Sequence, residues 1–555
     1  MPDLRAALND SSVIELYLPP DRVYSLGGTE LRVHGRSVRI WSEGSGATID
    51  GEHLSRLLTV EFGELELFNV HLTRGAASYA TPSCSAPSRI LYGGGGVLAC
   101  SATVRLTNVS IVECIVTEAG LASAIATSTA HVTGNMSVLE GAGAAAYNCT
   151  LFFDLVTFDR CGMRMRGEVQ NTSASVCLRG GALGLSVVRL NATRCTFTDC
   201  GGDLDVVLPP YETNGQNPFA VEGGAMYSSD CHLTVADSSF VRCFARVYTD
   251  PVALARGGGI VTENTGMRTS ALEGWGSLTG SYDDLRLESV TLVECHTDTT
   301  GRSQGGAILF DGLGGGTVSA YGVIMRSSYA FSKNAITASG GAVTLLGGTG
   351  LFTNTHVEDC WVWSQGVARG GGFDLTIDLL TSQTFQPLAL TLTDSTITNC
   401  SCATNNTFPT VGAFRFGAFG GGIAALVQGT NPIQLVRTVI SSCGVSAPLP
   451  DQSRGGGIYL VAGIATMREG SLLLNNRAVH GASVWVTSGT ATYSLPAPAV
   501  RGASDRTNVS PSAPCRLHLA PYAWAPIICH AAVTCTRPCV LPNRRFLTCA
   551  LPNAS

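Results

Sequence analysis

Residues 180–183 read Gly180-Gly181-Ala182-Leu183, and this pattern of two glycines, a small residue and a large apolar residue recurs along the chain. The third position is always Ala or Gly. The further copies are Gly223-Gly224-Ala225-Met226, Gly257-Gly258-Gly259-Ile260, Gly305-Gly306-Ala307-Ile308, Gly340-Gly341-Ala342-Val343, Gly370-Gly371-Gly372-Phe373, Gly420-Gly421-Gly422-Ile423 and Gly455-Gly456-Gly457-Ile458. A fixed motif at irregular spacing is typical of a repeat solenoid whose loops vary in length.

A second motif, apolar-x-x-Cys, lies between the glycine motifs, as in Phe158…Cys161 and Phe197…Cys200. The position of the cysteine reads, from unit to unit, Cys114, Cys161, Cys200, Cys243, Cys295, Ser327, Cys360, Cys400, Cys443 and Asn475. Strand-like alternation precedes it, for example in residues 392–397. We expect the cysteines to form a structural ladder at one corner of each coil. The glycine pair then marks the opposite corner, where a positive φ or a close backbone approach is needed.

The residue before this position alternates in charge through seven units: Glu113, Arg160, Asp199, Arg242, Glu294, Arg326 and Asp359. Equivalent residues of neighbouring coils are about 4.8 Å apart at sheet spacing, so like charges would repel and opposite charges would pair. The alternation therefore predicts one repeat unit per coil.

These paired motifs resemble the Gly-Gly-Ala-(Ile/Leu/Val) and Phe-x-x-Asn repeats of the chlamydial polymorphic outer-membrane proteins over about residues 90–490. Cys mostly replaces the motif Asn here, and Leu472…Asn475 keeps it. The resemblance implies an all-β fold, a right-handed single-stranded parallel β-helix of the pectin-lyase-like type. It also implies surface exposure and an adhesin-like, membrane-associated role.

The composition favours an extracellular solenoid. The chain of 555 residues is 45% hydrophobic, carries 65 glycines and 20 cysteines, and has a net charge of −6, which argues against a nucleic-acid partner. Cysteine usage of this kind favours an oxidising compartment, where either inter-coil disulfides such as Cys161–Cys200 or a ladder of buried thiols would fit. Asn-x-Ser/Thr sequons make Asn108, Asn171, Asn191 and Asn405 glycosylation candidates. We predict no cofactor and no metal.

The organisation along the chain divides into four parts. Residues 1–75 are expected to form an N-terminal cap, with a short helix over residues 4–8, and the first coils. Residues 76–490 are the β-helix repeats, 491–510 a linker and 511–555 a Cys-rich module cut off by the chain end. The first residues lack the order of a signal peptide, and no run of 18 apolar residues predicts a transmembrane helix. We therefore expect a secreted or cell-surface protein of which this chain is a fragment or an incomplete gene model.

Polysaccharide lyases and glycoside hydrolases share the pectin-lyase-like fold, so acidic pairs are the natural catalytic candidates. Hydrolysis needs two carboxylates about 5–10 Å apart. The weak candidates are Asp203 with Asp205 and Asp374 with Asp378, each local in sequence and without an acidic partner in the next unit. We assign no catalytic residues on this basis.

One column offers a binding hypothesis. Arg179, Arg256, Arg369 and Arg454 each precede a glycine pair and could contact acidic glycans through bidentate hydrogen bonds. The function expected is a non-catalytic extracellular or cell-surface domain for adhesion, with glycans or surface proteins as partners. The alternatives are a carbohydrate-active enzyme of the pectin-lyase-like class and a structural spacer in a larger surface protein.

Overall fold

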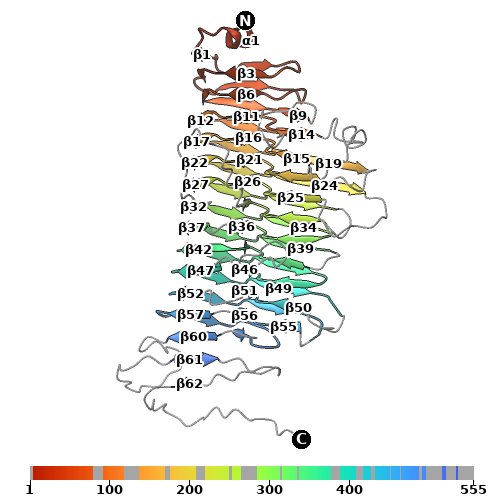
Figure 1. Ribbon diagram of the computed structural model, residues 1–555, viewed down its shortest axis with the longest axis vertical. Helices are drawn as coiled ribbons and strands as arrows, with labels where there is room; N and C mark the ends of the chain where they lie inside the picture. The colour runs from red at the N-terminus through yellow and green to blue at the C-terminus, as the bar shows by residue number, and fades with distance from the viewer. Residues whose placement is uncertain are drawn as a thin grey trace, which may run out of the picture.

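The chain is a parallel β-helix in a computed structural model, shown from the side in Figure 1. Residues 4–494 are described apart from several gaps, and so are two short strands at 516–519 and 533–534. The gaps are 79–91, 118–136, 169–175, 208–218, 249–252, 264–283, 313–315, 334–336, 377–387, 408–416, 427–431, 450–451, 463 and 487–489.

A complete coil contributes five short strands to five sheets that run along the helix, whereas the first two coils, over residues 15–61, contribute strands to only three of these sheets. One coil consists of β21 (Leu183–Ser186), β22 (Arg189–Thr193), β23 (Thr196–Thr198), β24 (Gly201–Val207) and β25 (Phe219–Glu222). We call the sheets that contain these strands C, A, B, D and E, in chain order. These strands pair in parallel with their equivalents in the neighbouring coils, so one repeat unit makes one coil, as the sequence predicts.

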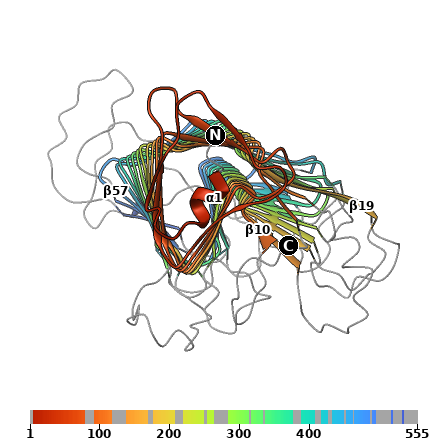
Figure 2. The ribbon, with the colours of Figure 1, turned by 90° about the horizontal axis from the view of Figure 1, so that it is seen from above.

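A main apolar core lies beside several smaller ones inside this cross-section. Sheets A, B and C enclose the main core, into which each strand turns alternate side chains such as Leu190 and Ala192 of β22. Sheets D and E pack on one another and form smaller cores, for example around Met163, Leu178 and Val221. Figure 2, the view along the helix, shows these two sheets extending from the three-sided body.

The two glycines of the motif have different roles at the corner between sheets E and C. Gly180 has φ +66°, a conformation that side chains rarely adopt. A Cβ on Gly181 would lie 2.2 Å from the Gly224 oxygen and 2.4 Å from the Gly201 nitrogen. The same turn also occurs at Gly94, Gly141 and Gly481, with φ of 67°, 55° and 59°. Residues 94–97 carry the full motif, whereas residues 141–144 and 481–484 lack the second glycine.

The predicted cysteine ladder lies buried between sheets B and D. The eight predicted ladder cysteines are free thiols, so the inter-coil disulfide alternative is not realised at these positions. The Cys161 thiol donates to the Ile111 carbonyl of the previous coil at 3.3 Å. Beside the ladder, Phe158, Phe197 and Phe240 stack at 5.0 and 4.5 Å between ring centroids.

Two members of this column were predicted one residue too early. β38 (Ile324–Arg326) pairs with β43 (His356–Glu358) so that Arg326 lies opposite Glu358, and Ser328 therefore takes the cysteine position instead of Ser327. By the same register, Asn476 replaces Asn475, and its side-chain oxygen accepts from the Cys443 amide at 2.9 Å. The error arose because Ser327-Ser328 and Asn475-Asn476 each offer two similar residues.

The alternating charges lie at the residue before the cysteine position, which has a positive φ in coil after coil. Arg160 pairs with Glu113 at 3.1 Å and Arg242 with Asp199 at 2.7 Å, so the predicted pairing along the column is confirmed for these coils. The alternation ends at Glu294, because Ser327 and not Arg326 occupies the next position.

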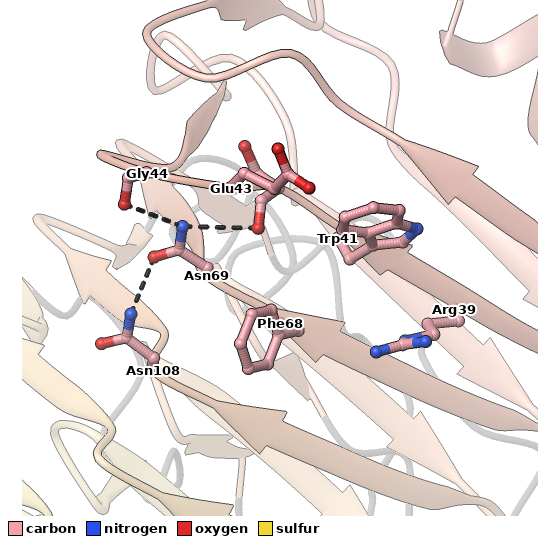
Figure 3. A pocket seen from close by; sticks show the side chains of 8 residues that line it. Arg39, Trp41, Glu43, Gly44, Phe68, Asn69 and Asn108 are labelled. Atoms are coloured by element: carbon pink, nitrogen blue, oxygen red, sulfur yellow. Dashed lines mark hydrogen bonds between the residues drawn. The ribbon is translucent and has the colours of Figure 1, made fainter.

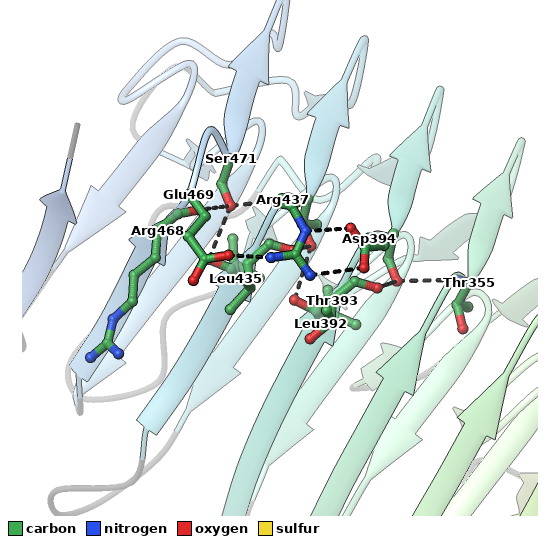
Figure 4. A network of polar contacts seen from close by, with 12 residues as sticks. Thr355, Leu392, Thr393, Asp394, Leu435, Arg437, Arg468, Glu469 and Ser471 are labelled. Carbon is green, nitrogen blue, oxygen red and sulfur yellow. Dashed lines mark hydrogen bonds and ion pairs between the residues drawn. The ribbon is translucent and has the colours of Figure 1, made fainter. Parts of the chain in front are cut away.

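A second charged column follows the corner between sheets A and B. Figure 4 shows Arg437 bridging three successive coils: it donates to both Asp394 oxygens, at 2.6 and 2.9 Å, and also contacts Glu469. Ser471, one coil further on, donates to the carbonyl of Leu435. Exposed pairs of this kind fix the register of neighbouring coils more than they stabilise the fold.

The two ends of the helix differ. The predicted capping helix is α1 (Leu4–Asn9), which turns Leu4 and Leu8 toward the first coil. At the other end, β60 (Thr490–Ser494) pairs in parallel with β57 (Ile464–Arg468), and β61 (Arg516–Leu519) and β62 (Val533–Thr534) then add antiparallel strands. Two strands of the Cys-rich segment thus continue sheet A.

Candidate binding surface on the first coils

A shallow hollow of about 460 Å³ lies on sheet A near the N-terminal end of the helix. It is lined by Arg39, Trp41, Ser42, Glu43, Gly44, Phe68, Asn69 and Asn108. Its apolar part comes from β4 (Ser37–Trp41) and β7 (Glu64–Phe68), whose last residues, Trp41 and Phe68, are register partners. Both therefore point out of the sheet at the same height along their strands.

Regular strand geometry determines this placement. β4 and β7 both alternate between buried and exposed positions, and the buried residues Val38, Ile40, Leu65 and Leu67 enter the main core. Trp41 and Phe68 follow these core residues at outward-facing positions, and Phe68 remains 38% exposed. On the opposite side of Trp41, Tyr17 of β1 (Glu15–Tyr17) packs against the indole at a centroid distance of 4.7 Å.

An amide ladder forms the polar side of the hollow. Asn69 has φ +53° and is buried, and its amide donates to the carbonyl oxygens of Ser42 and Gly44 at 3.4 and 3.2 Å. Asn108, its equivalent in the next coil, donates to the Asn69 side-chain oxygen at 2.7 Å. Asparagine suits this corner because it tolerates a positive φ. In Figure 3 these amides lie on one side of the two rings, and Arg39 lies on the other.

Ion pairs hold the charged edge of the hollow. The Arg39 guanidinium lies 3.3 Å from Glu15 and 3.5 Å from Glu66, its neighbours in the adjacent strands, and 5.8 Å from the Trp41 ring centre. Glu43 is exposed at the opposite rim. The surface thus offers two aromatic rings bordered by amide, carboxylate and guanidinium groups, a combination that suits a ligand with one apolar face and several hydroxyl groups.

The predicted arginine column does not form a glycan-contacting surface at Arg179, Arg256 and Arg369. These side chains are only 10, 15 and 9% exposed and are paired with buried acids. Arg179 lies 2.9 Å from Glu222 and stacks 4.4 Å from the centre of the Tyr227 ring, and Arg256 lies 2.9 Å from Glu263. Arg454 is half-buried and lies 5.5 Å from the Trp485 ring centre.

These arginines are enclosed because sheets D and E extend outward from the three-sided body. The residue before the glycine pair is the last of a sheet E strand, as in β20 (Val176–Arg179), and its side chain is enclosed against sheet C. There Glu222 is deeply buried. Burial would raise the pKa of its carboxyl group, but Arg179 and Arg256 hold that pKa below its ordinary value.

Among the described residues, the acidic candidates do not form a catalytic pair. Asp374, in β46 (Phe373–Thr376), is fully buried 3.5 Å from Arg369, and burial raises its pKa. Asp203 lies on sheet D, 3.8 Å from Arg164, with the exposed Asp205 two residues further along the same strand. Asp378 lies outside the described residues.

Three of the four glycosylation candidates are exposed. Asn108 lies at the rim of the hollow, Asn191 in the middle of the outer face of sheet A and Asn405 just after a sheet D strand. Asn171 lies outside the described residues.

Within the part of the chain that the structure describes, no three His, Cys, Asp or Glu side chains converge in a way that could hold a metal ion. No helix in that part has both the length and the apolar character to span a membrane.

The residues of the hollow were missed because they lie before the first glycine motif, where no repeat drew attention to them. The sequence signal for them is that each aromatic residue directly precedes a turn residue: Trp41 precedes Ser42, and Phe68 precedes Asn69. Compared with known proteins, the chain matches no family model and no curated protein sequence.

Proposed function

We propose that this protein is a non-catalytic extracellular or cell-surface β-helix domain that mediates adhesion, and that the hollow on the first coils contacts glycans. The observation that carries the proposal is the pair of outward-facing rings, Trp41 and Phe68, bordered by the ordered amides of Asn69 and Asn108. Sugar rings have an apolar C–H face and a rim of hydroxyl groups, and the hollow presents complementary groups on a rigid sheet.

Rigidity supports this role. The coils of β4 and β7 are hydrogen-bonded to one another along sheets A, B and C, so the hollow has fixed geometry before a ligand arrives. Preorganised sites lose less conformational entropy on binding. The resemblance of the repeats to those of chlamydial surface proteins, the glycosylation sequons and the parallel β-helix fold support an exported location and a glycan-facing role.

The test is binding of the purified chain, made without glycosylation, to a panel of immobilised polysaccharides. The release of reducing or unsaturated ends is followed in parallel. We expect binding without cleavage, and a loss of about tenfold or more in affinity for Trp41→Ala and Phe68→Ala. Tyr321→Ala is the matched control, because Tyr321 is 59% exposed and lies in the same outward column of sheet A several coils away.

Equal binding by the wild type and both hollow variants would refute a role for this hollow. Turnover of a polysaccharide would refute the non-catalytic function and favour the carbohydrate-active alternative. Absence of both binding and turnover would favour the spacer.

A further inference from the structure

Sheet D carries two columns of stacked aromatic side chains on its outer face. In the first, Phe244, His296, Tyr329 and Trp361 follow one another in successive coils, with centroid distances of 5.9, 4.6 and 4.3 Å and interplanar angles of 22°, 11° and 7°. In the second, Phe331 stacks on Trp363 at 4.8 Å and 14°. Because the rings stack along the helix axis, most of their faces are covered by one another.

Both stacks stop at the same strand, β44 (Trp361–Ser364). In the next strand, β49 (Ser401–Thr404), the register partners of Trp361 and Trp363 are Ser401 and Ala403. One coil further, in β54 (Gly444–Ser446), the partners are Gly444 and Ser446. Two indoles are therefore followed by small residues in both columns, and the sheet surface steps inward at this point.

The step leaves space above the indoles among the described residues. A Cβ placed on Gly444 would have no heavy atom within 4 Å, and the Ser401 side chain is exposed. Two coil spacings correspond to about 10 Å along the axis, room for one sugar ring lying parallel to the indoles. Trp361 and Trp363 are both half-buried, so their positions are fixed by packing on Tyr329 and Phe331.

Polar groups border the step. Asn399 is exposed and its amide donates to the Asp359 carboxylate at 2.6 Å, at the corner that leads into β49. Gln365 is exposed just after β44. Arg326, the cation on the neighbouring strand of sheet B, is paired with Glu358 at 2.9 Å. Beyond the step, the exposed Arg477 is the bridge partner of Gly444 in the following coil. The amide, hydroxyl and carboxylate groups beside the indoles can exchange hydrogen bonds with the hydroxyl groups of a sugar ring.

We propose that the ledge formed by Trp361, Trp363, Ser401 and Ala403 is a binding site for a pyranose ring of a glycan. The sugar stacks its apolar face on the two indoles and takes the place that the next aromatic pair of the columns would occupy. The hydroxyl groups of the sugar exchange hydrogen bonds with three side chains that border the ledge: Asn399 at the corner before β49, Ser401 at the start of β49 and Gln365 just after β44. This site lies on sheet D and does not depend on the hollow on sheet A.

The experiment measures binding of soluble cellohexaose, chitohexaose and mannohexaose by calorimetry and tryptophan fluorescence. It uses the full chain made in a host that does not glycosylate it. We expect at least one of these neutral oligosaccharides to bind, and Trp361→Ala and Trp363→Ala each to weaken it by about tenfold or more. Ser401→Trp is the decisive variant, because it fills the step with a third indole and removes no aromatic group; we expect it to abolish binding while thermal stability is kept.

Trp41→Ala separates this site from the hollow: binding at the ledge persists in that variant even if the hollow binds nothing. Unchanged affinity in Ser401→Trp, or no binding of any of the three oligosaccharides by the wild type, would overturn the proposal. Asn399 is also the acceptor of an Asn-Cys-Ser sequon, so the chain's own glycan is a second source of a sugar ring. If binding by unglycosylated protein is absent but a secreted, glycosylated form gains thermal stability that Asn399→Gln abolishes, the occupant is that attached glycan and the free-ligand proposal is wrong.

Discussion

His296 makes the stability of the coils around it depend on pH. It is buried in the aromatic column between Phe244 and Tyr329, with 7% of its surface exposed. Its Nε2 accepts from the Arg246 guanidinium at 2.9 and 3.1 Å, and its Nδ1 donates to the Glu294 carbonyl at 3.1 Å. These contacts require the neutral ring with its proton on Nδ1.

Burial, with the positive charge of Arg246, lowers the pKa of His296 from 6.5 to about 4. The unfolded chain therefore binds a proton that the folded chain does not bind between these two values. The contribution of His296 to the free energy of unfolding is complete above pH 6.5 and is lost as the pH falls toward 4. At about 1.4 kcal/mol per pH unit, the loss amounts to about 3 kcal/mol.

The assay is urea unfolding followed by tryptophan fluorescence at pH 7, 6, 5 and 4, for the wild type and His296→Phe. Phenylalanine preserves the stack and cannot titrate, so we expect the variant to lose about 3 kcal/mol less than the wild type between pH 7 and pH 4. His356→Phe, the same substitution at an exposed position of β43, is the matched control for the added phenyl ring. A difference below about 1 kcal/mol between wild type and His296→Phe would show that the buried ring is not held neutral.

Three further predictions test the corner, the buried charges and the surface pairs. Gly181→Ala forces a Cβ against backbone atoms and should lower the free energy of unfolding by about 3 kcal/mol or more, measured by thermal or urea unfolding. Gly444→Ala, with open space around it, should change that free energy almost not at all, and equal effects would contradict the close-approach explanation. Arg179→Met leaves Glu222 buried without its nearest cation and should destabilise by about 3–5 kcal/mol, while Arg164→Met, at a pair whose arginine is mostly exposed and 3.8 Å from its partner, should cost less than about 1 kcal/mol. A mild effect of Arg179→Met would mean that the acids are not held charged. Hydrogen bonding to Arg437 lowers the pKa of Asp394, so the stabilisation by this pair is present above the ordinary pKa and disappears as the pH falls. Unfolding curves of Asp394→Asn should show a small loss of stability at pH 7 that 1 M salt removes, and a loss of stability that does not depend on salt would refute an electrostatic origin.

The cross-section shows where sequence reasoning succeeded. Gly180-Gly181 needs both a positive φ and a close backbone contact, and Cys200 fills a small buried corner. Such demands recur in every coil, so they leave a periodic signal that predicts the helix, its corners and the pairing of Arg242 with Asp199. Where adjacent residues were alike, as at Ser327-Ser328, the pattern did not fix the register, and strand pairing decided it.

The proposed binding surfaces were determined by tertiary structure, because they depend on what lies in the next coil. The sequence indicated an exposed arginine column, yet the extension of sheets D and E encloses Arg179 and Arg369 against buried acids. It gave no reason to connect Trp41 with Phe68, or Trp363 with Ala403, since these residues are separated by 27 and 40 positions and meet only through register. A repeat determines the shape of one coil by local sterics, whereas a binding surface arises from differences between neighbouring coils, and those differences have no period to reveal them.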